Sequence, residues 1–325
     1  MMMKYISTKT VLTFFIITLG AFALQAQHAG RAGAFSRLGF GPRGMAMGNA
    51  LTAVTQEGIY GYYNPALVAH AKQGNQVDLS TAAMSFDRSL HTLSSTFQLP
   101  PSAGASISVI NANVNNIDGR TSDGYHTNML STHEYQFAAA AGISISKKIS
   151  VGIGVKYYLS DLHNELDNAT TVGLDLGFLY ILSDQLQLGG TVKDLLASYN
   201  WDSTPLWGDN GSSHSDPFPT QLRVGVSYQP ITKLLVSFDS GQEFYEKEST
   251  TFLRLGSTYH LHQYITIRGG WQIENLSSLK TSNHGSAGFS IYLPFDFMTP
   301  TIDYAFLQES NNISYMHTFG IQLNL

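Results

Sequence analysis

The sequence contains no cysteine and few charged residues. Without cysteine there can be no disulfide, no thiolate metal site, no cysteine nucleophile and no lipid-modified N-terminal cysteine. Charged residues make up 13% of the 325 residues, well below the roughly 25% that is usual in a soluble domain. This low share of charge indicates that much of the protein surface does not face water.

Long apolar runs are also missing, although 43% of the residues are hydrophobic. Beyond the first residues, no segment reaches the run of roughly 18 apolar residues that a membrane helix needs. The apolar residues are mixed with Gly, Ser, Thr and Asn, which suits a wall that is apolar outside and polar inside. The net charge of −5 is mild and there is no basic run, so nucleic acid is not an expected partner.

Catalytic and metal-binding motifs are absent as well. The chain has neither a G-x-S-x-G elbow nor an H-E-x-x-H helix. Asp202, Asp209 and Asp216 are spaced too loosely for a calcium loop. We therefore expect no enzyme activity, no catalytic residue, no metal site and no cofactor. A Ser/His pair on the barrel and a calcium ion bound by the loops are the alternatives.

The first 26 residues are typical of an export signal. Lys4 and Lys9 supply positive charge, and Val11 to Leu24 is an apolar stretch too short to span a bilayer. Ala26 provides a small residue at the expected cleavage position. We predict a signal peptide over residues 1–26, with an N-terminal membrane anchor as the alternative.

From Val77 onward, apolar and polar residues alternate. Val151, Ile153 and Val155 fall on one face of their segment, opposite glycine and lysine. Strict alternation over about ten residues is typical of a strand with two different environments, and a tilted strand of that length spans the hydrocarbon core. We predict about fourteen strands, the even number that a membrane barrel needs. They are expected near 77–86, 90–98, 103–112, 134–146, 149–160, 169–182, 185–194, 220–229, 233–241, 250–261, 263–274, 284–293, 297–307 and 313–325.

Short and long connectors alternate between these strands. Residues 146–149 and 182–185 are short connectors, whereas 113–133 and 195–219 are long and rich in Asn, Asp, Gly and Ser. An outer-membrane barrel has tight periplasmic turns and long outer loops. The apolar alternation of Phe319–Leu325 suits a last strand that pairs with the first and leaves no edge in lipid. The prediction is an all-β transmembrane antiparallel barrel over residues 77–325, in contact with outer-membrane lipid.

Residues 27–76 do not alternate like a strand. They contain Gly- and Ala-rich stretches that allow close backbone packing, followed by an Asn64-Pro65 step that favours extended or turn geometry. Arg43 needs a carboxylate partner if it is buried. By inward parity alone, Asp175 and Asp239 are the candidates.

Residues 39–69 contain an Arg, a Met/Gly/Ala stretch, an A-x-T-A-V run and an N-P-A. This pattern resembles PorV/PorQ-type proteins, which belong to the wider group of FadL-like outer-membrane barrels. Thr55, Gln56 and Glu57 stand where the family often has Asp pairs. The resemblance implies a fourteen-stranded barrel in the outer membrane, with 27–76 folded inside as a plug or hatch. A periplasmic extension is the alternative for 27–76. The plug motif consists of Gly41, Arg43, Met45, Met47, Gly48, Asn64 and Pro65.

Two functions follow from this resemblance. The first is an accessory role in type IX protein secretion or in surface attachment of cargo, with secretion-system components or exported cargo proteins as partners. Trp201 and Trp207, in the 195–219 connector, are then the candidate partner contacts, although they can equally pack within the loop.

The second function is FadL-like transport of hydrophobic small molecules. It requires an apolar pocket near the plug and a lateral exit through a kinked strand. The Gly-rich stretches 149–155 and Gly189-Gly190 can hold such a kink, or they can relieve crowding in the wall. A structural barrel or general porin is the third possibility, and a plug argues against free diffusion through it.

Overall fold

The computed structural model describes residues 31–71, 75–163, 166–246, 248–276, 282–295, 299–309 and 314–325. The signal peptide predicted over residues 1–26 lies outside these ranges. Within them, no helix is both long enough and apolar enough to cross a membrane.

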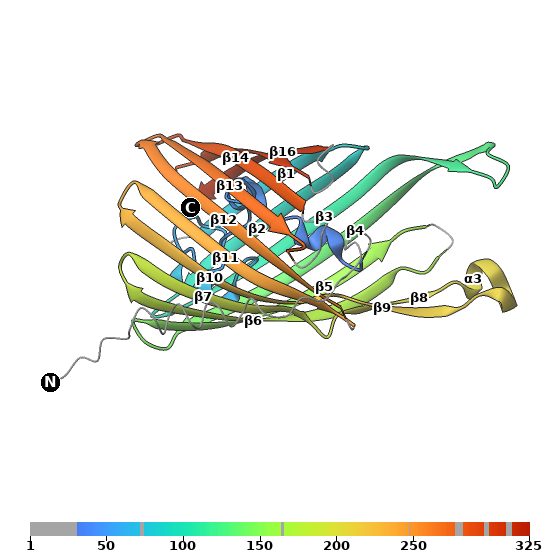
Figure 1. Cartoon of the computed structure of the whole chain (residues 1–325), viewed down its shortest axis with the longest axis horizontal. Coiled ribbons are helices and arrows are strands. Elements are labelled where there is room, and N and C mark those ends of the chain that lie inside the picture. Colours follow the sequence, from blue (N-terminus) through green and yellow to red (C-terminus); the bar gives the residue numbers. More distant parts are fainter. Residues whose placement is uncertain are drawn as a thin grey trace.

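Fourteen strands in the described part of the chain close into an antiparallel barrel (Figure 1). They are β1 (Asn75–Met84), β2 (Arg88–Leu99), β3 (Ala103–Arg120), β4 (His126–Ser144), β5 (Ile149–Asp161), β6 (Ala169–Ser183), β7 (Leu186–Leu195), β10 (Thr220–Ile231), β11 (Leu234–Tyr245), β12 (Glu248–His262), β13 (Ile265–Glu274), β14 (Ser282–Tyr292), β15 (Thr301–Gln308) and β16 (Tyr315–Asn324). β1 pairs with both β2 and β16, so Leu79 lies opposite Leu93 and Ile321. Because the pairing runs around the whole ring, each strand finds its backbone partners within the wall. The predicted fourteen-stranded barrel is confirmed.

The alternation in sequence becomes two faces of the wall. On β10, Leu222 and Val224 are exposed on the outer face, whereas Gln221 and Arg223 are buried on the inner face. A row of exposed aliphatic side chains is unfavourable in water and favourable in lipid. The outer face is therefore the membrane-facing one, and the polar residues line the interior.

The two ends of the barrel differ, as the connector lengths predict. Short turns join β4 to β5, β6 to β7, β10 to β11 and β12 to β13 at one end, which we call the short-turn end. The longest connections project from the other, the long-loop end, at the right of Figure 1.

The segment 113–133 is not the loop that was expected. β3 and β4 continue through it as a hairpin, and Arg120 pairs with His126 near its tip. Beyond the membrane both faces of a two-stranded ribbon meet water, so apolar alternation ends while backbone pairing continues. A pattern-based prediction therefore places the strand ends too early.

The 195–219 connector also has a structure of its own. β8 (Ser198–Asp202) and β9 (Ser213–Pro217) pair as a separate two-stranded sheet. Two short helices, α3 (Thr204–Trp207) and η3 (Gly208–Asn210), join them. We call β8, β9 and this tip the outer hairpin.

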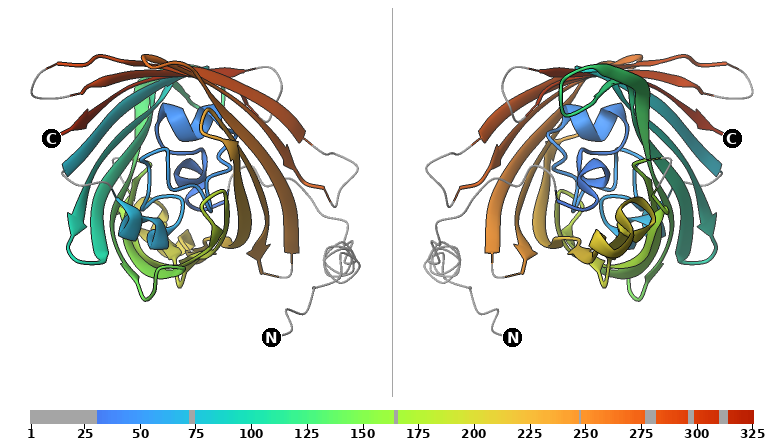
Figure 2. Two further views of the ribbon diagram at one scale, coloured as in Figure 1. Left: turned by 90° about the vertical axis from the view of Figure 1, so that its left-hand side faces the viewer. Right: turned by 90° about the vertical axis from the view of Figure 1, so that its right-hand side faces the viewer.

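Residues 31–71, which we call the inner segment, lie within the ring of strands (Figure 2, blue). The segment contains the short helices η1 (Ala34–Arg37), α2 (Gly41–Ala46) and η2 (Pro65–His70). α2 packs against β13 to β16 and β1, whereas η2 packs against β2 to β6. The core of the molecule therefore lies between the inner segment and the inner face of the wall.

Candidate functional site in the barrel interior

Glycines on the inner face of the wall make room for the inner segment. A Cβ added at Gly270 would lie 2.1 Å from the backbone nitrogen of Gly48, and one at Gly189 would lie 2.3 Å from the carbonyl oxygen of Thr52. Such distances are too short for any side chain, so the two backbones touch directly. Comparable close approaches to the inner segment occur at Gly104, Gly142, Gly152, Gly177, Gly256, Gly288 and Gly320.

These glycines decide between the two roles considered for the Gly-rich stretches. Gly152, Gly154, Gly189 and Gly190 all pair in continuous register with the neighbouring strands. They therefore mark no bulge in the ladder. Gly152 and Gly189 instead relieve crowding where Pro65 and the Thr52 region press against the wall.

Most residues of the predicted plug motif are buried against the wall. The Met45 sulfur accepts a hydrogen bond of 3.3 Å from the hydroxyl of Thr318, and the Met47 sulfur lies 3.1 Å from the hydroxyl of Thr258. Gly48, with a φ of 59°, donates its backbone N–H to Ser286 Oγ at 3.1 Å. These contacts connect the end of α2 with β12, β14 and β16.

The Asn64-Pro65 step starts η2 and joins it to the wall. Asn64 Oδ1 accepts from the backbone N–H of Ala66 at 3.0 Å, which caps the helix. Asn64 Nδ2 donates to the carbonyls of Thr52 at 2.8 Å and Phe178 at 3.0 Å. Pro65 occupies the first turn of η2, where a missing N–H costs nothing.

Arg43 pairs with Asp303 on β15, with Nε 2.9 Å from Oδ2. The expected partners, Asp175 and Asp239, are both wrong. Asp175 pairs with Lys156, and Asp239 accepts hydrogen bonds from Thr52. Inward parity shows which face a carboxylate occupies but not its position around the ring, and α2 lies against β15.

A second buried pair continues this network. Arg268 Nη2 lies 2.7 Å from Glu57 Oε2, and Thr258 donates to Glu57 Oε1 at 2.8 Å. Ser290 joins the two pairs because it accepts from Arg268 and donates to Asp303. Burial raises the pKa of Glu57, but the guanidinium groups of Arg268 and Arg43 outweigh it, so the pKa lies below its ordinary value. In the sequence, Glu57 stands out only as one of the residues at the place where the resembled family often has Asp pairs.

A bulge in β7 brings further charges into the interior. The β6–β7 register shifts between Leu174 and Leu176, which turns Asp194 inward. Lys156 on β5 lies 2.8 Å from Asp175 and 2.7 Å from Asp194. The Asp175 carboxylate also accepts the backbone N–H of Asp194 at 2.9 Å. One lysine thus connects three adjacent strands.

Two arginines, Arg223 on β10 and Arg254 on β12, have no ion pair among the described residues. The guanidinium carbons of Arg223 and Arg254 lie 5.3 and 4.5 Å from the ring centre of Phe252. Lys193 donates to the carbonyl of Tyr62 at 2.9 Å and faces its ring at 4.3 Å. Aromatic faces therefore take the place of carboxylates for these cations.

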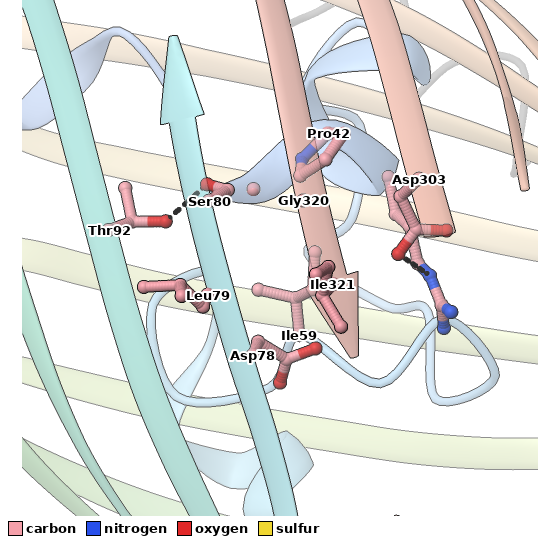
Figure 3. Close-up of a pocket in the computed structure, with 11 residues that line it drawn as sticks. Pro42, Ile59, Asp78, Leu79, Ser80, Thr92, Asp303, Gly320 and Ile321 are labelled. Carbon is pink, nitrogen blue, oxygen red and sulfur yellow. Dashed lines mark hydrogen bonds and ion pairs between the residues drawn. The ribbon is translucent and has the colours of Figure 1, made fainter. Parts of the chain in front are cut away.

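Two small cavities lie between the inner segment and the wall. One, beside α2, is lined by Arg43, Asp78, Ser80 and Asp303 among others, and has a volume of about 10 Å³ (Figure 3). This is room for about one water molecule, which suits the Arg43 Nη2 atom that has no protein partner. A second cavity, beside Tyr60, is equally small. Neither cavity is large enough for a hydrocarbon ligand.

Aromatic rings from three parts of the chain meet near the long-loop end. Phe35 of the inner segment lies 6.3 Å from Tyr158 of β5, measured between ring centres. Phe218 lies 4.6 Å from Tyr158 and 4.9 Å from Tyr199 of β8. All four rings are buried. We call Phe35, Tyr158, Tyr199 and Phe218 the aromatic mouth.

The two tryptophans predicted as partner contacts have different surroundings. Trp201 packs against Tyr199, with 5.6 Å between ring centres, and belongs to the edge of the aromatic mouth. Trp207 is 67% exposed at the tip of the outer hairpin. Among the residues that the structure describes, no group of three or more His, Asp or Glu is arranged to hold a metal ion.

No protein-family model matches the sequence, and no curated protein is similar to it in sequence. The fold, in contrast, is similar to that of several solved structures. The Ralstonia pickettii toluene transporter TbuX shares 14% identity over 88% of this chain and 97% of its own, with a TM-score of 0.62. The monoaromatic hydrocarbon channel CymD shares 14% over 88% and 96%, with a TM-score of 0.64. A Pseudomonas aeruginosa FadL homologue shares 10% over 88% and 98%, with a TM-score of 0.62.

The fold is therefore that of FadL-type outer-membrane barrels, and the protein is an outer-membrane β-barrel. The solved relatives are transporters and channels. The narrower PorV/PorQ resemblance finds no support in a family match.

Proposed function

We propose that this protein carries hydrophobic small molecules across the outer membrane. The observation that carries the proposal is a barrel interior occupied by the inner segment, with an apolar aromatic cluster at the long-loop end. A porin-like role requires an open aqueous lumen. The similar folds of toluene and monoaromatic hydrocarbon transporters support the proposal.

The inner segment is, in this proposal, a plug. Close backbone contacts at the wall glycines and the buried Arg43–Asp303 and Glu57–Arg268 pairs argue against its leaving the barrel as a whole. Removing one partner of a buried ion pair leaves an unpaired buried charge, which costs about 3–5 kcal/mol. A passenger therefore needs a local rearrangement rather than expulsion of the segment.

The exit for such a passenger is a break in the wall rather than the axis of the barrel. The β6–β7 bulge interrupts the ladder beside Asp194, and the Lys156–Asp175–Asp194 group fills the break from inside. This group is the candidate latch of a lateral exit.

Hydrocarbon uptake by whole bacterial cells tests the proposal, because the lipopolysaccharide leaflet rather than phospholipid limits entry. Cells that express the protein should take up low concentrations of radiolabelled toluene faster than cells with an empty vector. A plugged barrel should leave permeability to a small sugar unchanged. Equal toluene uptake in both strains, or free entry of the sugar, contradicts the proposal.

The type IX secretion role rests on the residue 39–69 motif alone. Under that hypothesis, Trp207 at the exposed hairpin tip contacts secretion-system components or cargo. Deletion of the gene should then release surface-attached cargo into the medium, and a Trp207→Ala variant should weaken co-purification of the partner. Cargo that stays fully attached after deletion contradicts the hypothesis.

A further inference from the structure

The ring of Phe218 packs directly on the backbone of the inner segment. Gly33 has a φ of 63°, and a Cβ added there would lie 1.9 Å from Phe218 Cε1. On its other side Phe218 faces Tyr158 at 4.6 Å between ring centres. The ring thus fills a slot between a glycine of the inner segment and an aromatic side chain of the wall.

The outer hairpin, which carries Tyr199 and precedes Phe218, is joined to the barrel by few polar contacts. β8 and β9 pair with each other and not with the barrel strands. The backbone N–H of Ser198 donates to Thr171 Oγ1 at 3.0 Å, and Tyr245 donates to Asp216 at 3.4 Å. Elements with few hydrogen bonds to the rest of a protein open locally at low cost in free energy.

The outer hairpin also carries a buried polar atom that is poorly hydrogen-bonded. The Tyr199 hydroxyl is buried and makes only a weak contact with Ser160 of β5, without a well-formed hydrogen bond among the described residues, whereas the Tyr158 hydroxyl donates to Asp194 at 2.6 Å. A poorly hydrogen-bonded buried hydroxyl is unfavourable, and lifting the hairpin returns it to water. This cost favours opening.

We propose that the aromatic mouth is a ligand site filled by the protein's own side chain, and that the outer hairpin is its lid. A flat apolar molecule the size of one benzene ring takes the place of Phe218 between Tyr158 and Gly33 when the hairpin lifts. The proposal rests on the proposed transport function and names the class of passenger that the site admits.

The surroundings explain why the site takes a neutral aromatic ligand. Aromatic rings pair favourably edge to face or offset, so a benzene ring restores the contacts that Phe218 gives up. Beside α2, a hydrocarbon would have to separate the Arg43–Asp303 ion pair, which leaves charges unpaired. The mouth receives such a ligand without that cost.

A disulfide across the lid tests the movement. Because the chain has no cysteine, a Thr171→Cys/Ser198→Cys double variant can form only the bridge between β6 and the outer hairpin. With the bridge formed, as shown by thiol titration, we expect toluene uptake by cells to fall about tenfold and to recover with a membrane-impermeant reductant. Each single-cysteine variant is the control, and its toluene uptake should change neither under the oxidising conditions that form the bridge nor on addition of the reductant.

The outcomes separate the lid from the function. Full uptake with the bridge formed overturns the lid and leaves transport intact. Absence of uptake by the unmodified protein overturns both.

Removal of the Phe218 ring tests the site itself. In a Trp207→Phe/Trp271→Phe background, emission from Trp201, which packs on Tyr199, reports toluene binding to the purified chain. Phe218→Ala removes the side chain that competes with the ligand, so the apparent affinity for toluene should rise about tenfold. Leu196→Ala, an exposed position in the same connector, should leave it unchanged. An unchanged or weaker affinity in Phe218→Ala, with heat-modifiable gel migration retained, overturns the proposal.

Discussion

The aromatic mouth and the rest of the inner segment differ in how they hold their contacts. From Gly41 to Ala71, the segment is held by ion pairs, hydrogen bonds and backbone contact at wall glycines. At the mouth, ring packing predominates, and the main polar contact is that of the Tyr158 hydroxyl with Asp194. Moving one side chain out of a network of buried ion pairs leaves another charge unpaired, which is unfavourable. Replacing a protein ring by a ligand ring restores similar contacts, so its cost in free energy is small. The difference separates a part that closes the barrel from a part that can admit a ligand.

The largest effect is expected at the buried ion pairs. Glu57→Gln leaves Arg268 without its charged partner, and we expect unfolding in denaturant to become easier by about 3–5 kcal/mol. The measurement is the unfolding midpoint in detergent, followed by tryptophan emission. Asp118→Asn, which removes the solvent-exposed partner of Arg120, is the control and should cost less than about 1 kcal/mol. Equal costs would show that burial does not distinguish the two pairs.

The second prediction concerns a methyl group added at a wall glycine, which should disturb the inner segment. Gly270→Ala places a Cβ against the backbone of Gly48, and we expect a loss of about 1–3 kcal/mol together with faster proteolysis within residues 31–71. The neighbouring Gly269 has no atom within 4 Å of an added Cβ. Gly269→Ala should therefore leave both measurements unchanged. If both variants behave alike, the inner segment does not depend on contact with the wall at this position.

The two tyrosines of the mouth should differ from each other by an amount similar to that at the wall glycine. Tyr158→Phe removes a donor to the Asp194 carboxylate and should cost about 1.5–3 kcal/mol in unfolding free energy. Tyr199→Phe removes a hydroxyl that has no well-formed hydrogen bond among the described residues and only a weak contact with Ser160, and should be close to neutral or stabilising. A destabilised Tyr199→Phe variant would mean that this hydroxyl is well hydrogen-bonded after all, and would remove one argument for opening of the hairpin.

The strands could be predicted because their signal is local. Leu222 and Arg223 differ in chemistry, and their order along the chain is enough to assign them to opposite faces of β10. The hairpin over residues 113–133 was missed because alternation stops where both faces meet water. The export signal at residues 1–26 remains a prediction.

The interior could be predicted only in outline. Arg43 was expected to need a buried carboxylate, and it has one, but on Asp303 rather than on Asp175 or Asp239. Glu57 is separated from Arg268 by most of the chain, and nothing local in the sequence relates them. The contacts of the aromatic mouth could not be predicted for the same reason, since Phe35, Tyr158 and Phe218 come from three distant segments.

The sequence by itself determined that this is a barrel of fourteen strands with an apolar outer face and a polar inner face. The alternation that predicts it has a period of two, which is a property of the strand backbone and does not depend on the neighbouring strands. The tertiary structure decided which inward residues meet: the glycines under the inner segment, the carboxylate for each buried cation, and the rings that close the mouth. Ring closure and shear set these pairings, and both depend on all the strands at once.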